Sequence, residues 1–200
     1  MTIIIGAIHN GSAFLGSDSL YSWGENFVRV CKTSKFIPVP DNKFLLAGAG
    51  QDKFTQIFIR AMKHIAKDKA AKLEIRDIGN VYHLVDVLQD EVMKCSGIGD
   101  AENNQLPDHD MSLMIASKLA SKIWVIDSDY GVLEFDDYVC AGAGYIQGEA
   151  AMKALAARGI HGREAVETAL QVTCDLHPSC GGNIEIRELK LDSDTDTILM

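Results

Sequence analysis

The sequence predicts an α+β fold, a four-layer αββα sandwich of two antiparallel sheets with helices on both outer faces. Strand-like segments occur in groups that short turns can join, which favours antiparallel pairing. Helix-like segments occur in consecutive pairs, which does not suit a doubly wound parallel sheet. The length of 200 residues allows one sizeable core, so we expect a single domain over residues 1–200.

The first predicted hairpin lies at the N-terminus. Residues 2–8 are mainly β-branched, and the dipeptide Asn10-Gly11 is a strong signal for a two-residue hairpin turn. Residues 12–18 form the returning strand. The polar stretch YSWGEN at 21–26 and a mixed stretch over 27–39 follow, and Pro38 and Pro40 indicate a turn.

The remaining elements follow in groups. Apolar runs bounded by turn residues predict strands at 43–50, 111–117, 122–128, 132–136, 138–144 and 181–191. Apolar residues at intervals of three and four, or a high alanine content, predict helices at 52–69, 81–96, 146–158 and 162–176. Residues 97–110 are rich in helix and strand breakers and predict a loop.

The composition restricts the class of protein. Apolar residues make up 47% of the chain and charged residues 24%, as in ordinary globular domains. The net charge of −9 argues against a nucleic-acid surface, which needs a basic footprint. No apolar run is long enough to span a bilayer, and the N-terminus lacks the basic region of a signal peptide, so we expect no membrane association and a cytoplasmic location.

The five cysteines do not suggest a disulfide framework, and we interpret most of them as small core residues. Cys174, His177 and Cys180 have a spacing that could ligate zinc, but no fourth ligand is evident and Pro178 suggests a helix end. We therefore expect no metal site and no cofactor.

Two strands end in the same tetrapeptide. FLLAGAGQD and YVCAGAGYI both have Ala-Gly-Ala-Gly before a predicted helix. Glycines at such a position permit tight strand-to-helix packing, or they let the backbone approach a ligand closely. Both readings stay open from the residues alone.

The stretch TIIIGAIHNGSAFLGSDS at 2–19 contains Thr2, Gly6, Asn10-Gly11 and Gly16-Ser17-Asp18. This arrangement resembles the N-terminal hairpin of proteasome β-type subunits and HslV-like peptidases, which are N-terminal nucleophile (Ntn) hydrolases. In that family Thr comes first, a Gly follows, a Gly-containing turn is next, and Ala/Gly-x-Asp ends the second strand. Asp18 follows Thr2 by sixteen residues, as the family pattern requires.

Later segments extend the resemblance over nearly the whole chain. Lys35-Phe36 fits the family's Lys before an apolar residue, with one residue inserted relative to the usual spacing. LLAGAG at 45–50 fits the strand that runs into Ala-Gly. GAGYIQGEAAMKAL and CGGNIEIREL also resemble the family.

The resemblance implies a threonine peptidase or amide hydrolase whose nucleophile is Thr2, exposed by removal of Met1. A free α-amino group has a pKa near neutrality and could take the hydroxyl proton. By resemblance, Lys35 holds this amine neutral and Asp18 fixes Lys35, although Lys32 is close enough in sequence to compete. The Gly50 amide is the candidate oxyanion donor.

The sequence departs from the family in two places. The second Ala-Gly-Ala-Gly has Ala143 where relatives commonly carry Ser. The C-terminal Asp-x-x-Ser-Gly of the family, when aligned on Cys180-Gly181, puts His177 at the Asp position. Asp175 and Ser179 are then tentative supporting residues that lie out of register.

Alternative interpretations remain. Each residue has an ordinary structural role, since Thr2 suits a strand and Asp18 a turn. A catalytically silent, ring-forming scaffold would keep the fold and retain Met1. A GDSL-type serine esterase would use Ser19, His177 and Asp175, but both of its motifs are broken here.

The partners expected from the resemblance are a peptide or amide substrate, a homo-oligomeric ring and an ATP-dependent unfoldase.

Overall fold

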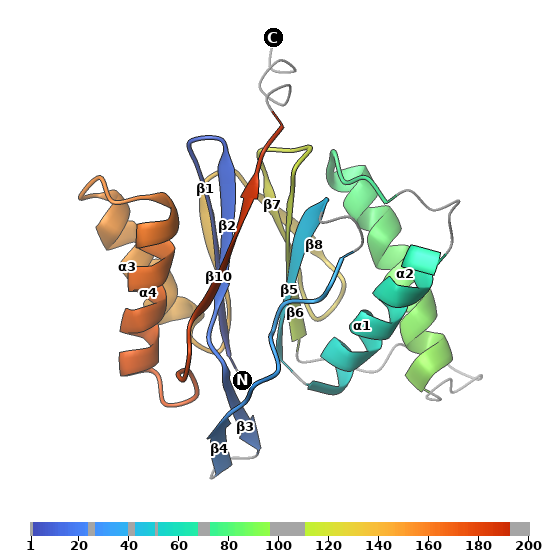
Figure 1. Cartoon of the computed structure of the whole chain (residues 1–200), viewed down its shortest axis with the longest axis horizontal. Helices are drawn as coiled ribbons and strands as arrows, with labels where there is room; N and C mark the ends of the chain where they lie inside the picture. The colour runs from blue at the N-terminus through green and yellow to red at the C-terminus, as the bar shows by residue number, and fades with distance from the viewer. Residues whose placement is uncertain are drawn as a thin grey trace.

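The protein is built in four layers, with a pair of helices on each outer side of two facing sheets (Figure 1). The computed structural model describes residues 2–23, 27–39, 43–50, 52–67, 73–96 and 111–192. The α+β sandwich predicted from the sequence is confirmed by this arrangement of antiparallel sheets. The predicted loop at 97–110 lies outside the described residues.

The first sheet has the strand order β10-β2-β1-β9 and is antiparallel throughout. Its strands are β1 (Ile3–His9), β2 (Ser12–Ser17), β9 (Tyr138–Gly142) and β10 (Glu185–Lys190). The turn between β1 and β2 is the predicted one, and both Asn10 and Gly11 have positive φ, at 48° and 68°. Ile4 pairs with Ser17, and Ile3 pairs with Gly142. This register places the start of the chain between the ends of β2 and β9.

The second sheet has the order β5-β6-β7-β8 and is also antiparallel. Its strands are β5 (Phe44–Gly50), β6 (Met111–Ser117), β7 (Ile123–Ile126) and β8 (Val132–Phe135). In this order β8 is an edge strand of the second sheet, and β9 is an edge strand of the first. Along the chain, β8 is directly followed by β9.

A short hairpin projects beyond the sheets, formed by β3 (Leu20–Trp23) and β4 (Phe27–Val30). The sequence patterns did not predict this hairpin, because residues 21–26 are mainly polar. Tyr21 and Trp23 are strand formers, and their pairing with the following segment outweighs the polar residues between them.

The helices cover the two sheets in sequential pairs. They are α1 (Asp52–Lys67), α2 (Ile78–Ser96), α3 (Tyr145–Ala156) and α4 (Gly162–Leu176). Helices α1 and α2 contact the second sheet, and α3 and α4 contact the first. Among the helices that the structure describes, none combines the length and the apolar character needed to cross a membrane.

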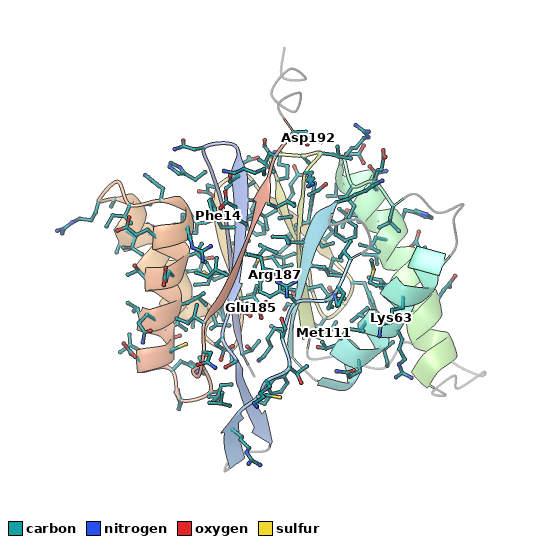
Figure 2. The ribbon with its side chains drawn as sticks, viewed as in Figure 1. Phe14, Lys63, Met111, Glu185, Arg187 and Asp192 are labelled. Atoms are coloured by element: carbon teal, nitrogen blue, oxygen red, sulfur yellow. The ribbon has the colours of Figure 1, made fainter. Side chains whose placement is uncertain are left out.

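Buried apolar side chains fill the three spaces between adjacent layers (Figure 2). Phe58 and Trp124 belong to the core under α1 and α2. Leu15 and Met114 belong to the core between the sheets, and Val166 belongs to the core under α4. The candidate site lies where the start of the chain borders the core between the two sheets.

The last strand is shorter than predicted. It begins at Glu185 rather than residue 181, because Gly181 and Gly182 have φ values of 153° and 80°. Such backbone angles do not continue a regular strand. The two glycines instead bring the chain back toward Asp18, where Gly181 makes a contact described below.

Candidate active site

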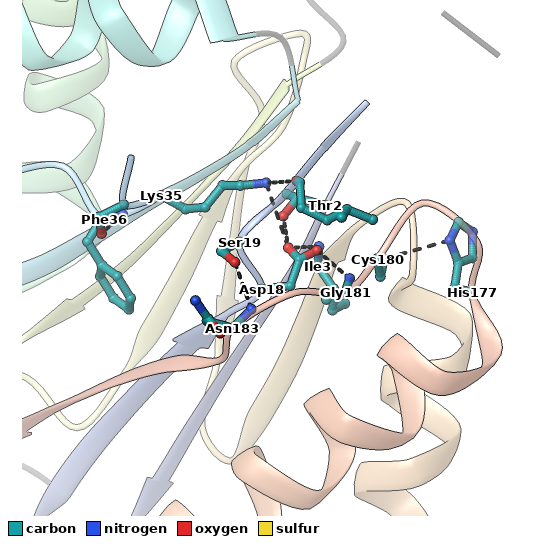
Figure 3. Close-up of polar contacts among 12 residues, drawn as sticks. Thr2, Ile3, Asp18, Ser19, Lys35, Phe36, His177, Cys180, Gly181 and Asn183 are labelled. Carbon is teal, nitrogen blue, oxygen red and sulfur yellow. Dashed lines mark hydrogen bonds and ion pairs between the residues drawn. The ribbon is translucent and has the colours of Figure 1, made fainter. Parts of the chain in front are cut away.

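The structure brings Thr2, Asp18 and Lys35 together at one end of the sandwich (Figure 3). The Thr2 hydroxyl donates a hydrogen bond from Oγ1 to Oδ1 of Asp18. Nζ of Lys35 lies 3.7 Å from the same carboxylate oxygen. Residues that are far apart in sequence thus share one buried carboxylate.

Three elements position these side chains. Thr2 comes just before β1 and Asp18 just after β2, so the hairpin register sets them side by side. Lys35 lies on the segment that runs along β5: its carbonyl accepts the Gly48 N–H at 3.0 Å, and the following residue bridges to Ala47. The backbone therefore holds Lys35 against β5 of the second sheet.

Asp18 accepts two further hydrogen bonds, both from the backbone. The Ile3 N–H reaches Oδ1 at 3.2 Å, and the Gly181 N–H reaches Oδ2 at 2.9 Å. The Asp18 side chain is fully buried, and a buried carboxylate needs partners of this kind to offset its desolvation. The carboxylate is thereby fixed in one orientation under Thr2.

The Lys35 ammonium is also held on several sides. It donates to the carbonyl of Leu20 at 2.8 Å and lies 4.3 Å from the ring centroid of Tyr21. The residue is only 5% exposed, whereas the competing Lys32 is exposed. The structure therefore places Lys35, and not Lys32, beside Asp18.

A cleft of about 570 Å³ opens beside Thr2, and Gly50 lies in its wall. Gly50 has a φ of 127°, a conformation that residues with a Cβ rarely adopt. Thr2 itself is only 1% exposed in this cleft. The candidate nucleophile and the candidate oxyanion donor thus border the same space.

Both Ala-Gly-Ala-Gly turns face this cleft, since Gly142 and Ala143 also line it. A Cβ on Gly142 would lie 2.4 Å from the Thr2 carbonyl oxygen, which no side chain could tolerate. Glycine at this position lets the start of the chain pack against β9. Ala143, at the place of the family's Ser, supplies no hydroxyl.

The two tentative supporting residues do not join the cluster. Asp175 is exposed on α4, where its carboxylate accepts a hydrogen bond from the Gln171 side chain at 2.9 Å. Ser179 donates its backbone N–H to Nδ1 of His177 at 3.2 Å. Neither residue makes a hydrogen bond to Thr2 among the described residues.

His177 and Cys180 instead stabilise the turn that leads to Gly181. Nδ1 of His177 lies 3.6 Å from Sγ of Cys180, and the Cys180 N–H donates to the His177 carbonyl at 3.0 Å. Burial, and then the negative charge of Asp18, raise the pKa of the Cys180 thiol to about 12. Cys180 is thus a neutral thiol at physiological pH.

The esterase triad is not assembled. The Ser19 hydroxyl accepts the Asn183 N–H at 2.7 Å, and within the described part of the chain no hydrogen bond joins it to His177. The antiparallel sheets also lack the alternating strand–helix units of that family. Within the same residues, no group of three or more His, Cys, Asp or Glu side chains is arranged to hold a metal ion.

Four partners of the Asp18–Lys35 pair were not predicted from the sequence: the Ile3 and Gly181 N–H groups, the Leu20 carbonyl and the Tyr21 ring. For Gly181 the sequence does contain a signal, because the Gly-Gly pair after Cys180 interrupts the strand pattern and indicates a turn. The Leu20 carbonyl and the Tyr21 ring had none, because their roles depend on the unpredicted hairpin. The direct hydrogen bond from Thr2 to Asp18 was also not expected, since Asp18 was assigned to Lys35 alone.

The sequence comparisons give no match: neither a protein-family model nor a curated protein matches this chain significantly. Solved structures do match. BPH, a bacterial proteasome homologue from Thiobacillus denitrificans, superimposes with a TM-score of 0.78 at 17% identity, covering 96% of this chain and 100% of that chain. BPH in complex with epoxomicin has the same TM-score at 16% identity, with 95% and 99% covered.

Eukaryotic HslV from Trypanosoma brucei is similar as well, with a TM-score of 0.64 and 16% identity. The match covers 94% of this chain and 99% of that chain. At such low identity the comparisons establish the architecture. The protein has the HslV- and proteasome-like Ntn-hydrolase fold that its N-terminal hairpin predicts.

Proposed function

We propose that this protein is an N-terminal threonine hydrolase of the proteasome and HslV type, which cleaves peptide or amide bonds once Met1 has been removed. The observation that carries the proposal is that the Thr2 hydroxyl, at the edge of a cleft, donates a hydrogen bond to Asp18, which forms a buried ion pair with Lys35. The proteasome-like fold supports it. Met1 lies outside the described residues.

The reaction begins at Thr2. Its Oγ1 attacks the carbonyl carbon of the substrate, and the hydroxyl proton passes to the free α-amino group of the same residue. The carbonyl oxygen becomes an oxyanion, which the Gly50 N–H stabilises. Collapse of this intermediate breaks the C–N bond, and the leaving amine takes the proton from the ammonium. Water then hydrolyses the acyl ester on Thr2, with the α-amino group again as base.

Asp18 and Lys35 position the nucleophile. The Asp18 carboxylate orients the Thr2 hydroxyl through their hydrogen bond. The backbone N–H groups of Ile3 and Gly181 donate to the same carboxylate and hold it in this orientation. Lys35 balances the carboxylate and places a positive charge near the amine, which disfavours the protonated amine. Asp18 thus has a second role beyond holding Lys35.

Hydrolysis of fluorogenic peptides by the Met1-free protein tests the proposal. Thr2→Ala is expected to lower kcat/KM by at least about a thousandfold because it removes the nucleophile, whereas Thr2→Ser retains part of the activity. The matched control is Thr168→Ala, an exposed threonine on α4, which should leave turnover unchanged. Unchanged turnover in Thr2→Ala would contradict the assignment.

A silent scaffold of the same fold is the second candidate. The observation that favours it is the altered surrounding of Thr2, with Ala143 in the cleft and His177 and Cys180 at the supporting positions. A scaffold would retain Met1 and show no covalent reaction at Thr2. N-terminal sequencing of the purified protein distinguishes the two candidates.

Assembly forms part of the proposal. By resemblance to the HslV and proteasome type, we expect a homo-oligomeric ring that encloses the sites, to which an ATP-dependent unfoldase delivers folded substrates. Native mass spectrometry gives the number of subunits directly. Degradation of a folded protein only when ATP and a cognate ATPase are present would support the unfoldase.

A further inference from the structure

We propose that the cleft beside Thr2 binds a basic substrate side chain, lysine or arginine, next to the scissile bond. This inference rests on the proposed function and adds a substrate class to it. The cleft touches both Thr2 and Gly50, so a residue that flanks the reacting carbonyl can enter it.

The walls suit an apolar stem. Val125 from β7, Leu133 and Phe135 from β8 and Val139 from β9 line the cleft. The volume of about 570 Å³ is ample for one long side chain, since whole ligand pockets begin at roughly 300 Å³. Leu133 is 55% exposed, which leaves apolar surface at the mouth for the methylene groups of lysine or arginine.

The charge of the cleft suits a cationic head group. Among the residues that line the cleft, Asp127 is the only Asp, Glu, Lys, Arg or His. It is exposed at the end of β7, and Oδ1 accepts the Ser128 N–H at 2.7 Å. Within the described residues Oδ2 has no hydrogen-bond donor and can accept one from a ligand.

A second feature points to the same chemistry. Tyr145 lines the cleft at the start of α3 and is 51% exposed. An exposed aromatic ring attracts a lysine or arginine head group through its π face. Apolar walls with a carboxylate and an aromatic ring at the opening match a side chain with an apolar stem and a cationic end. An acidic side chain would be repelled by Asp127 and by the net charge of −9.

The test uses peptides that differ at one residue beside the scissile bond, with arginine, norleucine or glutamate on either side of it. We expect the highest kcat/KM for arginine, and a ratio of arginine to glutamate of at least about tenfold in low salt. Asp127→Asn should reduce the preference for arginine over norleucine by about threefold to fivefold, as for an exposed ion pair.

Asp129→Asn is the matched control. Asp129 lies in the same turn, is exposed and does not line the cleft. The inference is overturned if arginine and norleucine peptides react equally in the wild type. It is also overturned if both aspartate variants change the preference to the same extent.

A binding measurement separates this inference from the proposed function. Fluorescence anisotropy with the three peptides and the Thr2→Ala variant needs no turnover. Stronger binding of the arginine peptide, lost in Asp127→Asn, would support the inference even if no peptide is hydrolysed. If Leu133→Asp changes the oligomeric state but not the peptide preference, the cleft mouth is covered by a second copy and the inference is wrong.

Discussion

Asp18 is the residue on which the candidate site depends. It accepts hydrogen bonds from Thr2, Ile3 and Gly181 and pairs with the Lys35 ammonium, although its side chain is fully buried. A buried ion pair contributes little to stability compared with an apolar pair, but removing one partner leaves the other charge in a costly environment. This asymmetry can be measured.

We expect Asp18→Asn to lower the free energy of unfolding by about 3 kcal/mol, because Lys35 stays buried without its carboxylate. Asp136→Asn removes the carboxylate of an exposed ion pair with Lys122 and should cost about 1 kcal/mol or less. Urea unfolding followed by circular dichroism measures both. Equal losses in the two variants would show that the buried pair does not have the role assigned to it.

The imidazole of His177 supports the turn that carries Gly181. Its Nδ1 accepts the Ser179 N–H, and an asparagine Oδ1 can occupy nearly the same place. We therefore expect His177→Ala to lower the free energy of unfolding by about 1 kcal/mol and to lower kcat/KM as well. His177→Asn should keep most of the wild-type stability and most of the wild-type kcat/KM. If alanine and asparagine behave alike, the acceptor is not what matters at this position.

The buried thiols of Cys140 and Cys180 should lower the free energy of unfolding at alkaline pH. Burial, and then the Glu149 carboxylate, raise the pKa of Cys140 well above its usual range, while burial and Asp18 raise that of Cys180 to about 12. A thiol in the unfolded chain ionises near pH 8.5, so from there upward the native state retains protons that the unfolded state loses. Stability therefore falls as the pH rises above about 8.5.

Unfolding in urea at pH 7.5, 9 and 10 measures this effect. The double variant Cys140→Ala, Cys180→Ala should be less stable at pH 7.5 but should show a shallower fall between pH 7.5 and 10. A slope as steep as that of the wild type would indicate that other groups cause the alkaline loss.

At the scale of the elements, two glycines set the spacing between layers. A Cβ on Gly16 would lie 2.6 Å from Leu170 and 2.7 Å from Val166, both on α4. A Cβ on Gly6 would lie 2.7 Å from the sulfur of Met114 in the facing sheet. The absence of side chains here lets α4 and the second sheet pack closely on the hairpin that holds Thr2 and Asp18.

We expect Gly16→Ala to destabilise the protein by about 1–3 kcal/mol, because α4 must move away from β2. Gly79→Ala is the control: its added Cβ meets only the Asp77 carboxylate at 3.1 Å, and alanine favours helix α2. Thermal unfolding compares the two variants. A neutral Gly16→Ala would mean that the layers adjust more easily than their close packing implies.

The sequence predicted those parts of the fold whose signals are local. The Asn10-Gly11 turn, the strand at 111–117 and the helix at 162–176 have clear patterns, and the structure places them there. The β3–β4 hairpin was missed because its stability comes from pairing across a polar stretch. Local propensity does not encode such pairing.

The site was predictable only in part, for the same physical reason. The order and spacing of Thr2, Asp18 and Lys35 match a family pattern, and the structure brings them into contact. The Gly181 N–H reaches Asp18 from 163 positions further along the chain, through two glycines with positive φ. A contact at that separation depends on the complete fold and has no signature in the neighbouring residues.

At the scale of the whole molecule, the sandwich gathers the candidate site from distant parts of the chain. The hairpin β1–β2, the segment before β5 and the turn after α4 meet at one end, where the cleft opens. The same α+β architecture is found in T. denitrificans BPH and T. brucei HslV. The fold therefore places Thr2 at the cleft, and the proposed chemistry requires a free amine at that residue.

Intact-mass spectrometry of the purified protein, before and after reaction with a peptide vinyl sulfone, tests the central claim most directly. We predict a mass lacking Met1, a single covalent addition mapped by fragmentation to Thr2, and no addition in Thr2→Ala. A protein that retains Met1 completely and takes up no electrophile at Thr2 would contradict the account of a threonine hydrolase.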